Sequence, residues 1–238
     1  MTDKKKFNRI ITFGCSNTYG ESLPDVAGIE SDSVPPSKYS WPSVLEKLLN
    51  VPVINKAKGG ACNKHIWHII LNDYLPISKP DDTVIILWSY FDRYCMFQDD
   101  GKIKRLLRTD IRNKKLKDGT DYRGRNLYGN WKEWVKTWFN NYDSHKDMAL
   151  DSLCRINHIH LYLNSLGIEN YHFTCDDSKD FVHYLQAETM PDWFPKNILK
   201  QIKYEEEKYG FSSDKEHPSI EAQERMAKLI KLNIEVNQ

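Results

Sequence analysis

Three short segments of the 238-residue chain carry side chains that can take part in nucleophilic chemistry. They are 14–20 (GCSNTYG), 59–63 (GGACN) and 214–218 (DKEHP). A serine hydroxyl, an imidazole and a carboxylate are the side-chain groups that catalyse acyl transfer in many enzymes. Backbone N–H groups at glycines can bind the oxyanion that forms in such a reaction. Each segment alone is weak evidence, because a serine that follows a strand is usually a helix N-cap. The chemistry requires a fold that brings the three segments together.

The runs around these segments are typical of a parallel sheet. Strand-like runs at 9–14, 51–57, 82–90 and 169–174 alternate with helical periodicity at 40–50, 63–75, 148–167 and from Pro218 onward. This alternation predicts an α/β fold with right-handed crossovers between parallel strands. Ligands bind beyond the carboxyl ends of such strands, and the first two segments follow strand-like runs directly.

Two parts of the chain interrupt this pattern. We expect one domain, 1–238, with an aromatic and basic insertion at about 97–145 and an irregular aromatic segment at about 176–211. The basic run 102–117 indicates a solvated insertion, with phosphate or nucleic-acid contact as the alternative.

A tryptophan cluster lies within the insertion. Trp131, Trp134 and Trp138 recur at helical spacing and predict a helix face that packs on the domain. A carbohydrate platform or a partner surface is the alternative if that face is exposed.

Composition excludes several classes of protein. A formal net charge of +1 rules out a polycation that binds nucleic acid or an acidic membrane with its whole surface. We find no apolar run long enough to span a membrane and no cleavable apolar segment at the start, so we expect a cytoplasmic protein. If the chain is phage-encoded, a place in the virion is the alternative.

The five cysteines are odd in number and lack CxxC spacing, which predicts reduced thiols. Cys15 and Cys62 are expected to lie near each other, either as small buried residues or as a redox pair. His65 and His68, like His158 and His160, lack the spacing and carboxylate partner of a metal site, so no metal is expected.

Taken together and in this order, the three segments resemble the SGNH, or GDSL-like, hydrolase family of esterases. Gly14, Ser16 and Gly20 match the family's Gly-Asp-Ser-x-x-x-Gly block, although Cys15 replaces the aspartate. The Gly-Cys-Ser-x-Thr-x-Gly start is typical of a divergent bacterial and phage branch. The resemblance covers most of the chain but not the insertion. It implies a three-layer α/β/α sandwich with a flavodoxin-like parallel sheet of about five strands.

The resemblance also implies a catalytic triad. Asp214 and His217 match the family's Asp-x-x-His block. Ser16 would be the nucleophile, His217 the general base that takes its proton at Nε2, and Asp214 the group that orients the imidazole. A spacing of three places the acid and the base in one turn.

The oxyanion hole departs from the family pattern. Asn55 followed by Gly60 fits the second block, which implies that the Ser16 and Gly60 N–H groups are donors. The family's asparagine after the third strand is missing, and we expect Asn63, or failing that Ser89, to replace it.

Arg93 follows the same strand. It is expected to pair with a substrate carboxylate, or with Asp92 or Glu21 as a structural bridge.

The family implies hydrolysis of a small ester through an acyl-enzyme, without a cofactor, and O-acetyl groups on carbohydrate are the first substrate expected. The alternative is a catalytically weak SGNH-fold protein that serves as a structural or binding component of a larger assembly. A nucleic-acid-binding module that uses the basic run is a third, less favoured class.

Overall fold

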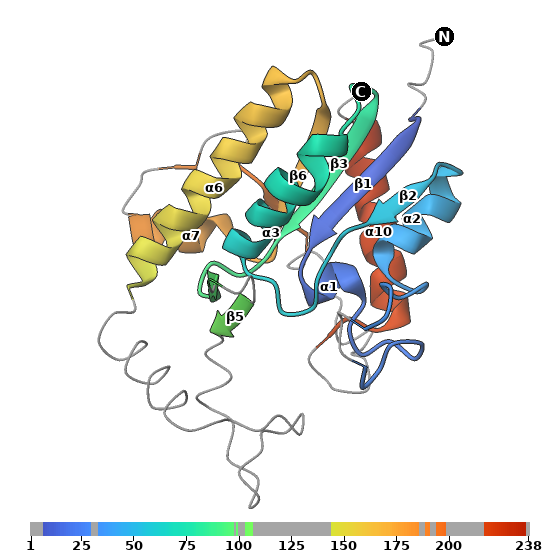
Figure 1. Ribbon diagram of the computed structural model, residues 1–238, viewed down its shortest axis with the longest axis horizontal. Helices are drawn as coiled ribbons and strands as arrows, with labels where there is room; N and C mark the ends of the chain where they lie inside the picture. The colour runs from blue at the N-terminus through green and yellow to red at the C-terminus, as the bar shows by residue number, and fades with distance from the viewer. Residues whose placement is uncertain are drawn as a thin grey trace, which may run out of the picture.

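The computed structural model describes residues 7–29, 33–97, 99, 103–106, 144–185, 189–190, 194–198 and 217–236. Five strands form one parallel sheet in the order β2-β1-β3-β6-β7. Figure 1 shows α3 and α6 on one face of the sheet and α2 and α10 on the other. The predicted three-layer α/β/α fold with about five parallel strands is therefore confirmed.

The elements follow the predicted alternation closely. The sheet strands are β1 (Arg9–Gly14), β2 (Val53–Asn55), β3 (Asp82–Trp88), β6 (Glu169–Thr174) and β7 (Lys196–Asn197). The helices are α1 (Ser16–Tyr19), α2 (Trp41–Leu49), α3 (Asn63–Ile69), α6 (His145–Ser165), α7 (Ser178–Leu185) and α10 (Ile220–Val236). After α3, the chain continues through a π-helical turn, η1 (Ile70–Tyr74), and a 3-10 turn, η2 (Leu75–Ile77).

The central strand β3 is buried along its whole length, as expected for a strand covered on both faces. Its register places Leu87 beside Gly14 of β1 and Trp88 beside Thr174 of β6. The three strands therefore end at the same level, so that the residues after β1, β3 and β6 meet at one edge of the sheet.

Within the segment 176–211 that we expected to be irregular, the structure corrects residues 178–185, while 186–188, 191–193 and 199–211 lie outside the described residues. Residues 178–185 form α7, which places Phe181 in a small cluster with Phe91 and Phe194, at ring-centroid distances of 5.4 and 4.9 Å. The helix is only eight residues long, which is shorter than the span over which helical periodicity is recognised, and this explains the error.

The expected insertion at 97–145 begins with an antiparallel strand pair, β4 (Tyr94–Phe97) and β5 (Ile103–Leu106). Its expected helical and tryptophan-rich part lies outside the described residues, and so does most of the basic run. In the parts of the chain that the structure describes, no helix has both the length and the apolar character needed to cross a membrane.

Candidate functional site

The turn after β1 is held by glycines at both ends. A Cβ on Gly14 would lie 2.1 Å from Thr18 Oγ1 and 3.0 Å from the Leu87 carbonyl oxygen. Gly20 has φ +82° and stands against Ser37 and Leu23. These contacts give a physical reason for the glycines that the sequence motif contains.

Ser16 is the first residue of α1, and it is only 2% exposed. Cys15 occupies the N-cap position before it.

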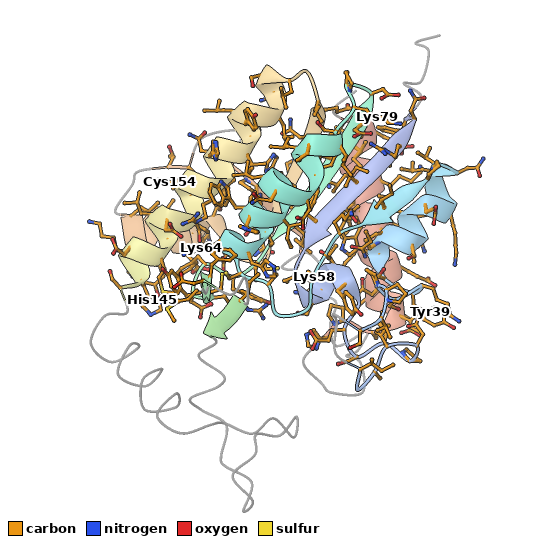
Figure 2. The ribbon with its side chains drawn as sticks, viewed as in Figure 1. Tyr39, Lys58, Lys64, Lys79, His145 and Cys154 are labelled. Atoms are coloured by element: carbon orange, nitrogen blue, oxygen red, sulfur yellow. The ribbon has the colours of Figure 1, made fainter. Side chains whose placement is uncertain are left out.

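The segment after β2 lies against this turn. Asn55 donates from Nδ2 to the Thr18 carbonyl oxygen at 2.9 Å, and the Lys58 N–H donates to the Gly14 carbonyl oxygen at 3.2 Å. Figure 2 shows Lys58 next to α1. Gly60 has φ +67°, so its left-handed conformation suits glycine. The structure thus brings the first two motif segments together, and the donor role of the Gly60 N–H stays a prediction.

The start of α10 packs on the same turn. Gln223 is fully buried, donates from Nε2 to the Asn17 carbonyl oxygen at 3.1 Å, and accepts the Trp41 N–H on Oε1 at 2.8 Å. One side chain therefore connects the C-terminal helix to the turn that carries Ser16 and to the start of α2.

His217, three residues before α10, is buried at this junction. Its Nε2 lies 3.9 Å from Glu21 Oε2, and the Glu21 N–H donates to the Ser16 carbonyl oxygen at 3.1 Å. The third motif segment thus approaches the first through Glu21. Asp214, its predicted partner, lies outside the described residues.

Asn63, the first choice for the missing oxyanion donor, is buried and already engaged. Its Nδ2 donates to Ser152 Oγ on α6 at 3.1 Å, which uses one of its two N–H groups. Its Oδ1 is buried without a hydrogen-bond partner among the described residues.

Ser89, the second choice, is fully buried and accepts a hydrogen bond from Arg93 Nη1 at 3.3 Å. The Arg93 guanidinium also lies over the Tyr90 ring, 4.8 Å from its centroid. Within the described part of the chain, neither Asp92 nor Glu21 comes within the 4.0 Å of an ion pair with Arg93. The structural bridge that the sequence left open is therefore not formed between these residues.

Cys15 and Cys62 are both free and buried, and each lies beside another cysteine. Cys15 interacts with Cys175, which follows β6, and Cys62 interacts with Cys95 on β4. A hydrogen bond from Cys175, reinforced by the nearby Arg93 and opposed by burial, holds the pKa of the Cys15 thiol well below its usual range. The sequence gives no sign of this pairing, because Cys15 and Cys175 follow strands that are separated by β3.

Sequence reasoning also missed Asp176, a buried carboxyl at the same edge. Its Oδ2 accepts the Phe91 N–H at 2.7 Å, and burial raises the pKa of the group to about 8. The only available signal was an acidic residue two positions after the strand at 169–174. Among the described residues, no group of three or more His, Cys, Asp or Glu side chains is arranged to hold a metal ion.

Comparison with known proteins adds to this geometry. No protein-family model matches the chain, and no curated protein matches its sequence. The chain is similar in structure to the lipase Lip_vut3 from goat rumen metagenome, with a TM-score of 0.50 and 13% identity over 94% of this chain and 96% of that one.

Two weaker structural similarities were also found. One is to a lipase/acylhydrolase from Enterococcus faecalis, with a TM-score of 0.48 and 14% identity over 97% of this chain and 96% of that one. The other is to the acetyl xylan esterase AlAXEase, with a TM-score of 0.48 and 11% identity over 95% of this chain and 99% of that one. At such low identities, the comparison shows only that this chain shares the fold of the Lip_vut3 structure.

Proposed function

We propose that the protein is a serine esterase of the SGNH, or GDSL-like, type that hydrolyses a small ester through an acyl-enzyme. The observation that carries the proposal is the packing of the start of α10 on the Ser16 turn. Gln223 and His217 both reach this turn, so that two motif segments about 200 residues apart lie at one edge of the sheet. The lipase-like fold supports the same reading, because it presents its strand ends at that edge.

In the proposed reaction, Ser16 Oγ attacks the ester carbonyl carbon while His217 Nε2 takes the hydroxyl proton. His217 then returns that proton to the leaving alcohol, and an acyl group stays on Ser16. Water attacks the acyl group with His217 again as the base, which releases the acid and restores the serine. Asp214 would orient the imidazole, and the Ser16 and Gly60 N–H groups would hold the oxyanion.

In the structure without substrate, His217 Nε2 lies 3.9 Å from Glu21 Oε2. Apo arrangements of catalytic groups are often looser than those of the substrate complex, so this geometry is compatible with the proposal.

The second candidate is a catalytically weak protein with the same fold that binds rather than hydrolyses. The missing asparagine after β3 favours it, because one lost oxyanion donor typically costs about 10² to 10³ in rate. Low turnover with an intact, reactive Ser16 would move the assignment toward this candidate.

The proposal is tested by acetate release from 4-nitrophenyl acetate and from acetylated xylan. Wild type should release acetate, and Ser16→Ala should reduce the rate by about 10³-fold or more. Ser78→Ala is the matched control, because Ser78 precedes β3 at the opposite edge of the sheet and should keep the wild-type rate. Equal rates for wild type and Ser16→Ala would contradict the proposal.

A further inference from the structure

Arg93 is a partly buried cation at the edge of the sheet where the motif segments meet. It follows β3, and its neighbours are the Ser89 hydroxyl, the Tyr90 ring and the Cys15 and Cys175 thiols. Cys15 immediately precedes Ser16, so the guanidinium lies close to the proposed nucleophile turn. Its hydrogen bond to Ser89 uses only Nη1, although a guanidinium has five N–H groups.

Two other arginines show how this chain normally satisfies such a group. Arg9 donates from Nε and Nη2 to the two carboxylate oxygens of Asp82, both at 2.7 Å. Arg155 does the same to Asp151, at 2.9 and 2.6 Å. In both cases the Nε–Nη2 edge binds a carboxylate with two parallel hydrogen bonds.

Arg93 differs from Arg9 and Arg155 in the partners of its Nε–Nη2 edge. No carboxylate among the described residues lies within 4.0 Å of its nitrogens, and no hydrogen bond from its Nε or Nη2 is found there. A guanidinium removed from water is costly unless it is paired, and the described residues leave the Nε–Nη2 edge of Arg93 without a carboxylate.

Cys15 can supply part of the missing negative charge. A thiolate presents only one acceptor atom, however, whereas the two parallel N–H groups of the edge match the two oxygens of a carboxylate. A carboxylate matches them in spacing and in charge, as Asp82 and Asp151 show for the other two arginines.

We infer that the Nε–Nη2 edge of Arg93 binds a carboxylate of the substrate, so that the site prefers esters that carry a carboxylate near the scissile bond. This inference rests on the proposed esterase function for its meaning in catalysis. It deepens that function by assigning an anionic substrate class, and it makes Arg93 a specificity-determining residue.

The first test is binding, which needs no turnover. Benzoate, its neutral analogue benzamide and inorganic phosphate are compared by saturation-transfer difference NMR on wild type, Arg93→Met and Arg155→Met. Benzoate should bind wild type and Arg155→Met, and its signal should be lost in Arg93→Met. Arg155→Met is the matched control, because it removes an arginine whose carboxylate partner is on the protein. Binding of phosphate but not benzoate, or benzoate binding that persists in Arg93→Met, would overturn the inference.

The second test is specificity with two matched ester pairs. 4-Acetoxybenzoate against 4-acetoxybenzamide places the charge on the alcohol side, and 4-nitrophenyl hydrogen glutarate against 4-nitrophenyl valerate places it on the acyl side. For each pair, the kcat/KM of the anionic ester is divided by that of the neutral ester, in wild type and in Arg93→Met. For one of the pairs, this ratio should be about tenfold or more higher in wild type than in Arg93→Met. Arg93→Lys should keep part of this preference, because lysine retains the charge but loses the fork.

The two proposals fail differently. If wild type hydrolyses the neutral esters but the anionic-to-neutral ratio is the same in wild type and in Arg93→Met for both pairs, the carboxylate preference is wrong and the esterase function stands. If no ester is hydrolysed while benzoate binding still depends on Arg93, the esterase proposal fails and the anion site stands.

Discussion

Gln223 of α10 donates from Nε2 to the carbonyl oxygen of Asn17, a 3.1 Å hydrogen bond between residues that are 206 positions apart. Asn17 directly follows Ser16, so this bond fixes the end of the chain against the turn that carries the proposed nucleophile. The same side chain accepts the Trp41 N–H, which has no helical partner at the first position of α2. A single buried amide therefore connects α10, the Ser16 turn and the start of α2.

Replacing Gln223 with leucine should destabilise the fold by about 2 to 4 kcal/mol, because it leaves the Trp41 N–H and the Asn17 carbonyl buried without a partner. Chemical denaturation measures this loss. Glu224→Ala is the control, since Glu224 is exposed on the next position of α10 and should change the unfolding free energy little. An equally small effect of Gln223→Leu would show that the amide does not support the junction.

Gly14→Ala should destabilise the protein by about 2 kcal/mol or more, because the added Cβ would overlap Thr18 Oγ1 and crowd the Leu87 carbonyl. Adding Thr18→Ala should recover part of the loss, because it removes the closest atom. Gly28→Ala serves as the comparison: Gly28, unlike Gly14, has positive φ, but no atom lies within 4 Å of its Cβ, so only backbone strain of about 1 kcal/mol is expected. Similar losses at both glycines would refute the steric argument.

Asp176 should make stability depend on pH. Burial raises its pKa to about 8 in the folded protein, whereas an aspartate in the unfolded chain titrates near about 3.9. Between these values the folded state holds the extra proton, so the unfolding free energy falls as pH rises, by up to about 1.4 kcal/mol per pH unit. Above pH 8 this contribution levels off.

Asp176→Asn should remove that fall, since an amide oxygen can still accept the Phe91 N–H but cannot titrate. Unfolding free energies of the two proteins should be similar near about pH 5 and should diverge toward about pH 8.5, with the variant more stable. Parallel curves across this range would mean that Asp176 is ionised at the lower pH.

The thiols should react according to their burial. Cys154 is exposed, whereas Cys15, Cys62, Cys95 and Cys175 are buried. Figure 2 shows Cys154 on α6. Iodoacetamide should therefore add one group to the native protein and five after denaturation, and Cys154→Ser should add none when native, as read by intact mass. A second rapid addition to the native protein would contradict the buried placement of the two thiol pairs.

The sequence predicted the elements that position the site more reliably than the contacts within it. Residues 82–88 are uniformly apolar after Thr83 and follow a helical stretch, which is enough to predict a central parallel strand. The sequence motif contains glycine at positions 14 and 20, and the structure explains both, because a Cβ at either position would collide with neighbouring atoms.

The partners of side chains at the sheet edge could not be predicted in this way. Asn63 donates to Ser152, and Cys15 interacts with Cys175, because α6 and β6 are brought to the edge by the crossover connections. Such pairings depend on where distant elements pack, and neither spacing nor composition records that. The short helix α7 was missed for a different reason, since eight residues are fewer than the span over which helical periodicity is recognised.

The central claim is that Ser16 is an activated nucleophile, and a fluorophosphonate probe tests it most directly. Wild type, Ser16→Ala, His217→Ala and the control Ser78→Ala are exposed to the probe in parallel, and their intact masses are measured. The account predicts one covalent adduct on wild type and on Ser78→Ala, and none on Ser16→Ala or His217→Ala. An adduct that survives in Ser16→Ala, or none on well-folded wild type, would contradict it.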